Sequence, residues 1–159
     1  MQISILGYTK KKIKGIIGVK TMYELEIDLV KDFQTKISGT PNKFTIIAVA
    51  SEFNYIEGKV DLIAKNENGD LIAFEAKLSR WRTALNQAYR NSSFAHYSYV
   101  VLPEITADNA VICIDEFCRR GVGLCSFGSS GLRVEIPATR RNPIQPWVTN
   151  MALSYIDGR

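Results

Sequence analysis

Apolar residues that recur every three or four positions predict three amphipathic helices along the chain. The expected helices span residues 22–37, 81–92 and 107–120. Thr21 is expected to cap the start of the first helix, because its hydroxyl can accept a hydrogen bond from a free backbone N–H. Gly39 and Gly121 follow the first and third helices, where a helix commonly ends.

Short runs rich in β-branched and aromatic residues predict six strands. The expected strands span residues 44–53, 59–64, 71–77, 97–102, 122–127 and 132–136. The segment Asn66–Asp70 contains an Asn-Gly pair, so the second and third strands are expected to form an antiparallel hairpin. Later strands are reached through helices, with right-handed crossovers. The predicted fold class is therefore α/β, a mixed β-sheet flanked by helices.

The pattern indicates one domain over the 159 residues, because no repeat or long flexible linker divides the chain. We expect a basic lead-in over residues 1–20, a core over 22–127 and a C-terminal extension over 137–159, with one more short helix near 147–155. No apolar run approaches the ~20 residues that span a bilayer.

The start of the chain and its cysteines bear on localisation. The lysines follow the apolar start, which is the reverse of a secretory signal. The three cysteines include no C-x-x-C pair, and His96 is the single histidine, so neither a disulfide framework nor a structural zinc site is expected. These features favour a reducing cytoplasm.

Positive charge is concentrated in two windows, although the net charge is only +4. Residues 1–20 carry five lysines and residues 76–103 carry four basic residues, and neither window contains an acid. Such clustering favours a polyanionic partner, with solvated basic faces as the alternative. The candidate nucleic-acid-binding residues are Lys10, Lys11, Lys12, Arg80, Arg82 and Arg90.

Three charged residues interrupt the otherwise apolar second and third strands, namely Asp61, Glu75 and Lys77. An unpaired buried ion costs several kcal/mol, so these positions require a reason. Side chains alternate faces along a strand, which places Glu75 and Lys77 on one side. An ion pair that closes the end of the sheet is the structural alternative.

The hairpin register decides whether Asp61 joins them. A two-residue turn at Asn68 and Gly69 would place Asp61 opposite Ala76, on the wrong face. A three-residue loop with Gly69 in the left-handed conformation, or a five-residue loop over 66–70, places Asp61 opposite Glu75 instead. Opposed positions are about 5 Å apart, close enough for two carboxylates to share a cation, and we predict this register.

Two carboxylates held together repel each other unless a hard cation such as Mg²⁺ or Mn²⁺ neutralises them. The Ala76 carbonyl is a ready third oxygen ligand. Lys77 could contact a phosphate oxygen, orient an attacking water or stabilise developing charge. The set therefore matches metal-assisted hydrolysis of a phosphodiester.

These residues resemble the PD-(D/E)XK, or restriction-endonuclease-like, nuclease superfamily. The resemblance covers residues 22–127 and implies an α-β-β-β-α-β core in which Asp61 and Glu75 bind Mg²⁺ and Lys77 assists catalysis. It also implies an acid on the first helix, for which Glu24 is the candidate and Glu26 the runner-up. The two cannot both face the site, because residues two apart on a helix lie about 200° around its axis. Gln87 is similar to a glutamine that several branches carry on the next helix.

Two positions depart from the family pattern. Val60 replaces the proline of the name, and Asn91 stands where exonuclease-like branches carry a tyrosine, which favours endonucleolytic cutting. The sequence thus predicts a Mg²⁺- or Mn²⁺-dependent deoxyribonuclease. A catalytically silent nucleic-acid-binding or assembly module of the same fold is the alternative, and RNA stays open as a substrate. A homodimer is expected because cutting both strands of a duplex needs two sites, and a role within a larger DNA-processing complex also stays open.

Overall fold

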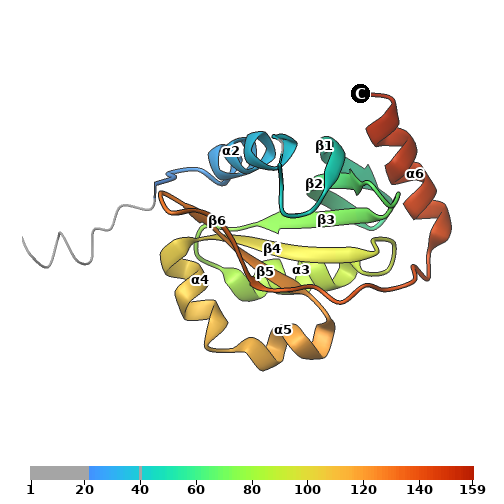
Figure 1. Cartoon of the computed structure of the whole chain (residues 1–159). Coiled ribbons are helices and arrows are strands. Elements are labelled where there is room, and N and C mark those ends of the chain that lie inside the picture. Colours follow the sequence, from blue (N-terminus) through green and yellow to red (C-terminus); the bar gives the residue numbers. More distant parts are fainter. Residues whose placement is uncertain (1–21, 40) are drawn as a thin grey trace, which may run out of the picture.

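A computed structural model describes residues 22–39 and 41–159 (Figure 1). Thr21 and the basic lead-in, with the candidates Lys10, Lys11 and Lys12, lie outside the described residues. Among the helices that are described, none combines the length and the apolar character needed to span a bilayer.

The six strands form one sheet in the order β1-β2-β3-β4-β5-β6 (Figure 1). Their bounds are β1 Ile46–Tyr55, β2 Gly58–Asn66, β3 Leu71–Ala76, β4 Tyr97–Pro103, β5 Gly123–Gly128 and β6 Gly131–Ile136. Strands β1, β2 and β3 pair antiparallel, β3, β4 and β5 pair parallel, and β6 returns antiparallel to β5. The predicted class is confirmed: the protein is a mixed α/β fold whose sheet is flanked by helices.

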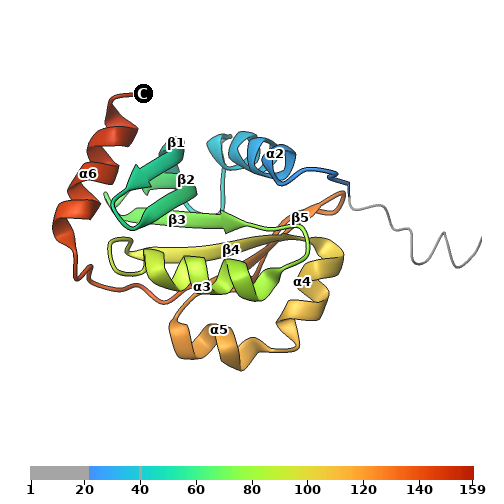
Figure 2. The ribbon, with the colours of Figure 1, turned by 180° about the vertical axis from the view of Figure 1, so that it is seen from behind.

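Helices cover both faces of the sheet. Their bounds are α2 Glu26–Ser38, α3 Trp81–Asn91, α4 Glu104–Val111, α5 Ile114–Arg120 and α6 Pro146–Asp157. Figures 1 and 2 show α2 on one side of the sheet and α3, α4 and α5 on the other, with α6 beside the β1–β2 hairpin. The expected C-terminal helix is confirmed as α6, which packs against β1 and the segment between α3 and β4.

Aromatic side chains fix α2 to the sheet. Phe33 of α2 lies between Phe74 of β3, with ring centroids 5.0 Å apart, and Phe127 of β5, at 5.6 Å. Both contacts are edge-to-face, an arrangement that adds to the free energy gained by burying the rings. This packing determines where the first turn of α2 meets the end of β3.

The first helix is shorter than the sequence pattern indicates. It begins at Glu26 rather than at residue 22, and Leu25 before it has an extended backbone. Tyr23 explains the difference, because it is buried and stacks on Phe127 at 6.4 Å instead of continuing the helix. Acidic side chains in the first turn, including that of Glu26, interact favourably with the helix dipole.

The expected helix over residues 107–120 is wrong as a single element. The chain breaks after α4, where Cys113 leaves the helical conformation, and α5 then begins at Ile114. The break allows Phe117 to stack on Trp81 of α3, with ring centroids 5.6 Å apart. Tertiary burial of one aromatic ring therefore outweighs the local helical pattern.

The β2–β3 connection has the predicted register. Leu62 pairs with Phe74, so the preceding residue of β2, Asp61, lies opposite Glu75. Residues 67–69 form the loop, and Gly69 has a positive φ of 80°, which suits glycine because it has no Cβ. The three-residue interpretation is confirmed, and both acids lie at one level of the sheet.

The aromatic contacts of α2 lead to a stability prediction. Replacing Phe33 with alanine leaves a cavity between α2 and the sheet, and we expect the free energy of unfolding to fall by about 3–5 kcal/mol. Urea unfolding followed by circular dichroism measures this change. Ile112→Ala is the control, because that side chain is 79% exposed and its loss should cost less than about 0.5 kcal/mol. Equal losses in both variants would contradict the proposed role of Phe33.

Candidate active site

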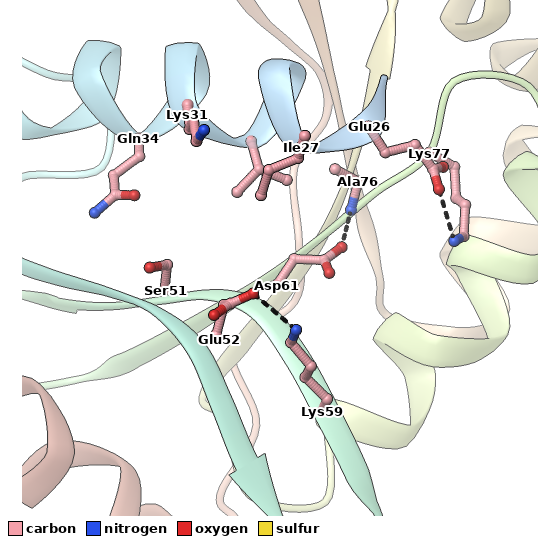
Figure 3. Close-up of a pocket in the computed structure, with 11 residues that line it drawn as sticks. Glu26, Ile27, Lys31, Gln34, Ser51, Glu52, Lys59, Asp61, Ala76 and Lys77 are labelled. Carbon is pink, nitrogen blue, oxygen red and sulfur yellow. Dashed lines mark hydrogen bonds and ion pairs between the residues drawn. The ribbon is translucent and has the colours of Figure 1, made fainter. Parts of the chain in front are cut away.

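A cleft of about 390 Å³ opens between α2 and the strands that carry the predicted acidic residues (Figure 3). One wall is α2, which contributes Glu26, Lys31 and Gln34. The opposite wall carries Asp61 of β2 and Ala76 of β3, with Lys77 directly after that strand. The cleft therefore contains both acidic and basic side chains, at the carboxyl end of β3.

Asp61 is fixed by the backbone of the neighbouring strand. Its Oδ2 accepts a hydrogen bond from the Ala76 N–H at 2.9 Å, as Figure 3 shows. In an antiparallel pair the N–H and the carbonyl of one residue face the same neighbouring strand, so the Ala76 carbonyl is directed toward β2 as well. Asp61 and the Ala76 carbonyl can thus present oxygen atoms to one ion.

Glu75 lies behind Asp61 and is almost completely buried, with 2% of its surface exposed. Its Oε1 accepts a hydrogen bond from Asn91 Nδ2 of α3 at 2.8 Å. Burial and the neighbouring charge and hydrogen bond of Asp61 raise the pKa of Glu75 to about 8, although Asn91 and Lys77 favour the ionised form. In the cation-free protein, burial and Asp61 therefore favour the protonated form of Glu75.

Lys77 turns toward the start of α2. Its Nζ lies 3.2 Å from Glu26 Oε1, and the other oxygen of Glu26 accepts a hydrogen bond from the Leu78 N–H at 3.2 Å. The structure thus brings Glu26, the runner-up, to the cleft. Glu24 lies before the helix, exposed and outside the cleft lining, because the helix begins at Glu26, four residues later than the sequence pattern indicates.

Helix α3 contacts Glu75 through a residue other than the family-like glutamine. Asn91, one turn further along α3 than Gln87, makes this hydrogen bond. Oε1 of Gln87 is buried and has no hydrogen-bond partner among the described residues. Sequence reasoning noted Asn91 only for the absence of a tyrosine. Its position four residues after Gln87, on the same face of the helix, was the available signal.

The cleft contains a second ion pair, between Lys59 and Glu52, and neither residue is among the predicted site residues. Lys59 Nζ lies 2.9 Å from Glu52 Oε1, and this contact lowers the pKa of Glu52. Ser51 pairs with Leu62 and Phe53 with Val60, so Glu52 lies opposite Asp61 across the first hairpin. Glu52 also has a positive φ of 58°, an uncommon conformation for a residue with a side chain.

The three described arginines that were expected to bind nucleic acid do not line the cleft. Arg82 forms an ion pair with Glu116 at 2.8 Å, and its guanidinium lies 4.1 Å from the ring centre of Trp81. Arg80 is exposed just before α3, and Arg90 lines a separate cavity near the other end of that helix. Within the cleft, the lysines of α2, β2 and the end of β3 provide the positive charge.

The candidate cation ligands at this site are the oxygens of Asp61, Glu75 and the Ala76 carbonyl. Among the described residues, no group of three or more histidine, cysteine or acidic side chains could hold a metal ion. Two opposed carboxyl groups and a carbonyl nevertheless match the oxygen ligands that Mg²⁺ and Mn²⁺ prefer. Few protein ligands are enough for Mg²⁺, because it usually retains several bound waters in protein sites. The raised pKa of Glu75 is consistent with a cation site, because a bound cation would stabilise the ionised form of Glu75 next to Asp61.

Comparisons with known proteins give fold-level similarity. No protein-family model and no curated protein sequence matches the chain. A solved structure of a protein of unknown function from Silicibacter pomeroyi matches with a TM-score of 0.51 and 15% identity, over 70% of this chain and 74% of that one. A repair endonuclease from Pyrococcus abyssi is a more distant neighbour, with a TM-score of 0.34 and 18% identity over 51% of this chain and 39% of that one. The first similarity shows the fold alone, and the second is too low to carry an argument about function.

The raised pKa of Glu75 leads to a prediction about stability. The folded state retains this proton up to about pH 8, whereas an ordinary pKa is 4.5, so stability should fall as pH rises between these values. Glu75→Gln keeps the shape without the charge. In EDTA we expect it to match the wild type near pH 5 and to exceed it by roughly 2–4 kcal/mol near pH 8.5.

Urea unfolding of both proteins across this pH range measures the difference. Glu67→Gln is the matched control, because Glu67 is exposed in the loop between β2 and β3. Parallel stability profiles for the wild type and Glu75→Gln would show that Glu75 ionises as readily in the folded chain as in the unfolded one.

Proposed function

We propose that this protein is a Mg²⁺- or Mn²⁺-dependent deoxyribonuclease of the PD-(D/E)XK type that cuts DNA endonucleolytically. The observation that carries the proposal is the register of β2 and β3, which places Asp61 opposite Glu75 with Lys77 just beyond the end of β3. An isolated ion pair at the end of a sheet would need one acid, whereas this site buries a second acid behind the first.

Asp61, Glu75 and the Ala76 carbonyl are the proposed ligands of the cation. When bound, such an ion polarises a phosphoryl oxygen and lowers the pKa of a coordinated water. The Ala76 N–H holds one oxygen of Asp61, and Asn91 holds one oxygen of Glu75. These hydrogen bonds restrict the rotation of both carboxylates and therefore orient their remaining oxygens.

Lys77 is the proposed group that acts on the substrate. Its ammonium can donate to a phosphate oxygen or orient the attacking water as negative charge develops on the phosphoryl group. Glu26 holds Lys77 at the mouth of the cleft through the 3.2 Å ion pair. In the reaction, the oxygen of water bonds to phosphorus, the bond to one ester oxygen breaks, and that oxygen leaves with a proton.

One observation favours the second candidate, a nucleic-acid-binding or assembly module without activity. Glu75 is buried, does not line the cleft and has a raised pKa, so binding a cation there requires that Glu75 lose its proton against this shift. The first candidate is preferred because Asn91 and Lys77 both favour the ionised form of this buried acid. A homodimer is proposed for cutting both strands, and RNA is the alternative substrate.

A cleavage assay tests the proposal. Supercoiled, linear, single-stranded and branched DNA are incubated with the wild type in Mg²⁺, Mn²⁺ or EDTA, beside Asp61→Asn and Lys77→Ala. We expect metal-dependent cutting by the wild type and at least a 100-fold loss of rate in both variants, because each removes a group that acts at the reacting phosphate. Asp28→Asn and Lys36→Ala, exposed positions on α2, are matched controls expected to cut normally. Intact cutting by Asp61→Asn would refute the assignment, and DNA binding without any cutting would favour the binding module.

The position of α2 gives a separate prediction about its acidic residues. Glu26→Gln removes the partner of Lys77, and we expect the cleavage rate to fall by about 10- to 100-fold. Glu24→Gln should change the rate less than about twofold, because Glu24 lies outside the cleft lining. Single-turnover cleavage with both variants measures the difference. A larger loss in Glu24→Gln would show that the acid before the helix serves the site.

A further inference from the structure

A second cavity, of about 520 Å³, lies near the C-terminal end of α3. Its lining includes Tyr89 and Arg90 of α3, Arg141 of the segment before α6, and Glu57 of the turn between β1 and β2. None of these residues lines the catalytic cleft, so the cavity is a separate feature of the surface. Its charged lining residues are the cationic Arg90 and Arg141 and the acidic Glu57.

The arginines around this cavity lack acidic partners. Arg90, Arg120 and Arg141 form no ion pair with a carboxylate in the part of the chain that the structure describes. By contrast, Lys59 and Lys77 in the cleft are both paired with glutamates. Uncompensated guanidinium groups that gather around a concave surface attract an anion, and their planar forks suit phosphate oxygens.

Several contacts hold two of these arginines in position. Arg141 Nη2 donates to the Arg120 carbonyl at 2.7 Å, while Arg141 Nε is buried without a partner among the described residues. Arg120 in turn donates from Nη1 to the Glu116 carbonyl at 2.9 Å. The side chain of Arg141 packs against Gly121, where an added Cβ would lie 2.7 Å from Nη2. These contacts of the folded chain therefore hold Arg120 and Arg141 in position.

An aromatic ring completes the lining. Tyr89 is 50% exposed, and the Arg120 guanidinium lies 6.0 Å from its ring centre. An exposed ring beside phosphate-binding cations is the combination that binds single-stranded nucleic acids, because a base can stack on the ring while the backbone contacts the arginines. An acidic protein segment would use the cations but would not need the ring.

The position of the cavity relates it to the cleft. Glu57 lines the cavity and Lys59, two residues further along the hairpin, lines the cleft, so the β1–β2 turn separates the two. Ile56 at this turn is 99% exposed. We propose that the arginine cavity binds the phosphates and a base of a single-stranded nucleic acid segment, which continues over the turn into the cleft. The path into the cleft rests on the proposed function, whereas binding in the cavity does not.

Binding and cutting can be measured separately. A fluorescein-labelled single-stranded DNA of about 12 nucleotides is titrated in EDTA, and its anisotropy gives the affinity at several salt concentrations. We expect Arg90→Ala to weaken binding about 3- to 10-fold and to reduce the salt slope by roughly 0.7, the value for one lost phosphate contact on a single strand. Tyr89→Ala should weaken binding at least about 5-fold, and Tyr89→Phe should restore it.

Two further variants control for general charge effects. Arg133→Ala removes one positive charge from an exposed arginine of β6 and should leave the affinity within about twofold of the wild type. Glu57→Gln removes the acid of the cavity and should tighten binding about 2- to 3-fold. Equal weakening by Arg133→Ala and Arg90→Ala would overturn the proposal, because binding would then follow net charge alone.

The outcomes separate this site from the proposed function. If Asp61→Asn loses cutting and binds the oligonucleotide like the wild type, while Arg90→Ala binds weakly, both inferences stand. If no metal supports cutting but Arg90→Ala and Tyr89→Ala bind weakly, the cavity is confirmed and the nuclease is not. Normal binding by both cavity variants would reject the cavity whatever the cleavage assay shows.

Discussion

Asp61 and Glu75 lie opposite each other on neighbouring strands, and almost no solvent reaches Glu75. The folded chain accommodates this pair because the raised pKa of Glu75 favours its neutral form and because the Ala76 N–H and the Asn91 amide each satisfy one carboxyl oxygen. Those hydrogen bonds require β2, β3 and α3 to keep their present alignment. The alignment of β2, β3 and α3 that stabilises the two facing carboxyl groups is therefore the same alignment that sets the geometry of the site.

The aromatic core connects stability to the cleft. Phe33 packs between Phe74 and Phe127, and the same helix presents Glu26 to Lys77 about two turns earlier. Phe74 and Glu75 are adjacent on β3 and point to opposite faces, so one short strand supports both the apolar core and the buried acid. Helix α2 therefore carries both a main packing contact of the core and the ion-pair partner of Lys77.

The two concave surfaces differ in how their charges are compensated. In the cleft, Lys59 and Lys77 each form an ion pair with a glutamate, so their charges are compensated within the cleft. Around the second cavity, backbone carbonyls position Arg120 and Arg141, and none of the described carboxylates forms an ion pair with these two residues or with Arg90. The β1–β2 hairpin separates the surfaces, and the unusual conformation of Glu52 within β1 belongs to the cleft side.

The strands and the facing of Asp61 with Glu75 could be predicted from the sequence, because alternation along strands and the conformational freedom of Gly69 are local properties, whereas the choice between a three- and a five-residue loop came from the structure. The sequence also placed Lys77 beside these acids. Only the tertiary structure decided that Tyr23 leaves the first helix to stack on Phe127, and this choice brings Glu26 rather than Glu24 to the cleft. Likewise, the packing of α3 on the sheet brings Asn91 to Glu75. The packing of the C-terminal segment brings Arg141 to the cavity that Arg90 lines. Such contacts join residues far apart in the chain, and local periodicity carries no information about which partner the packed core brings within reach.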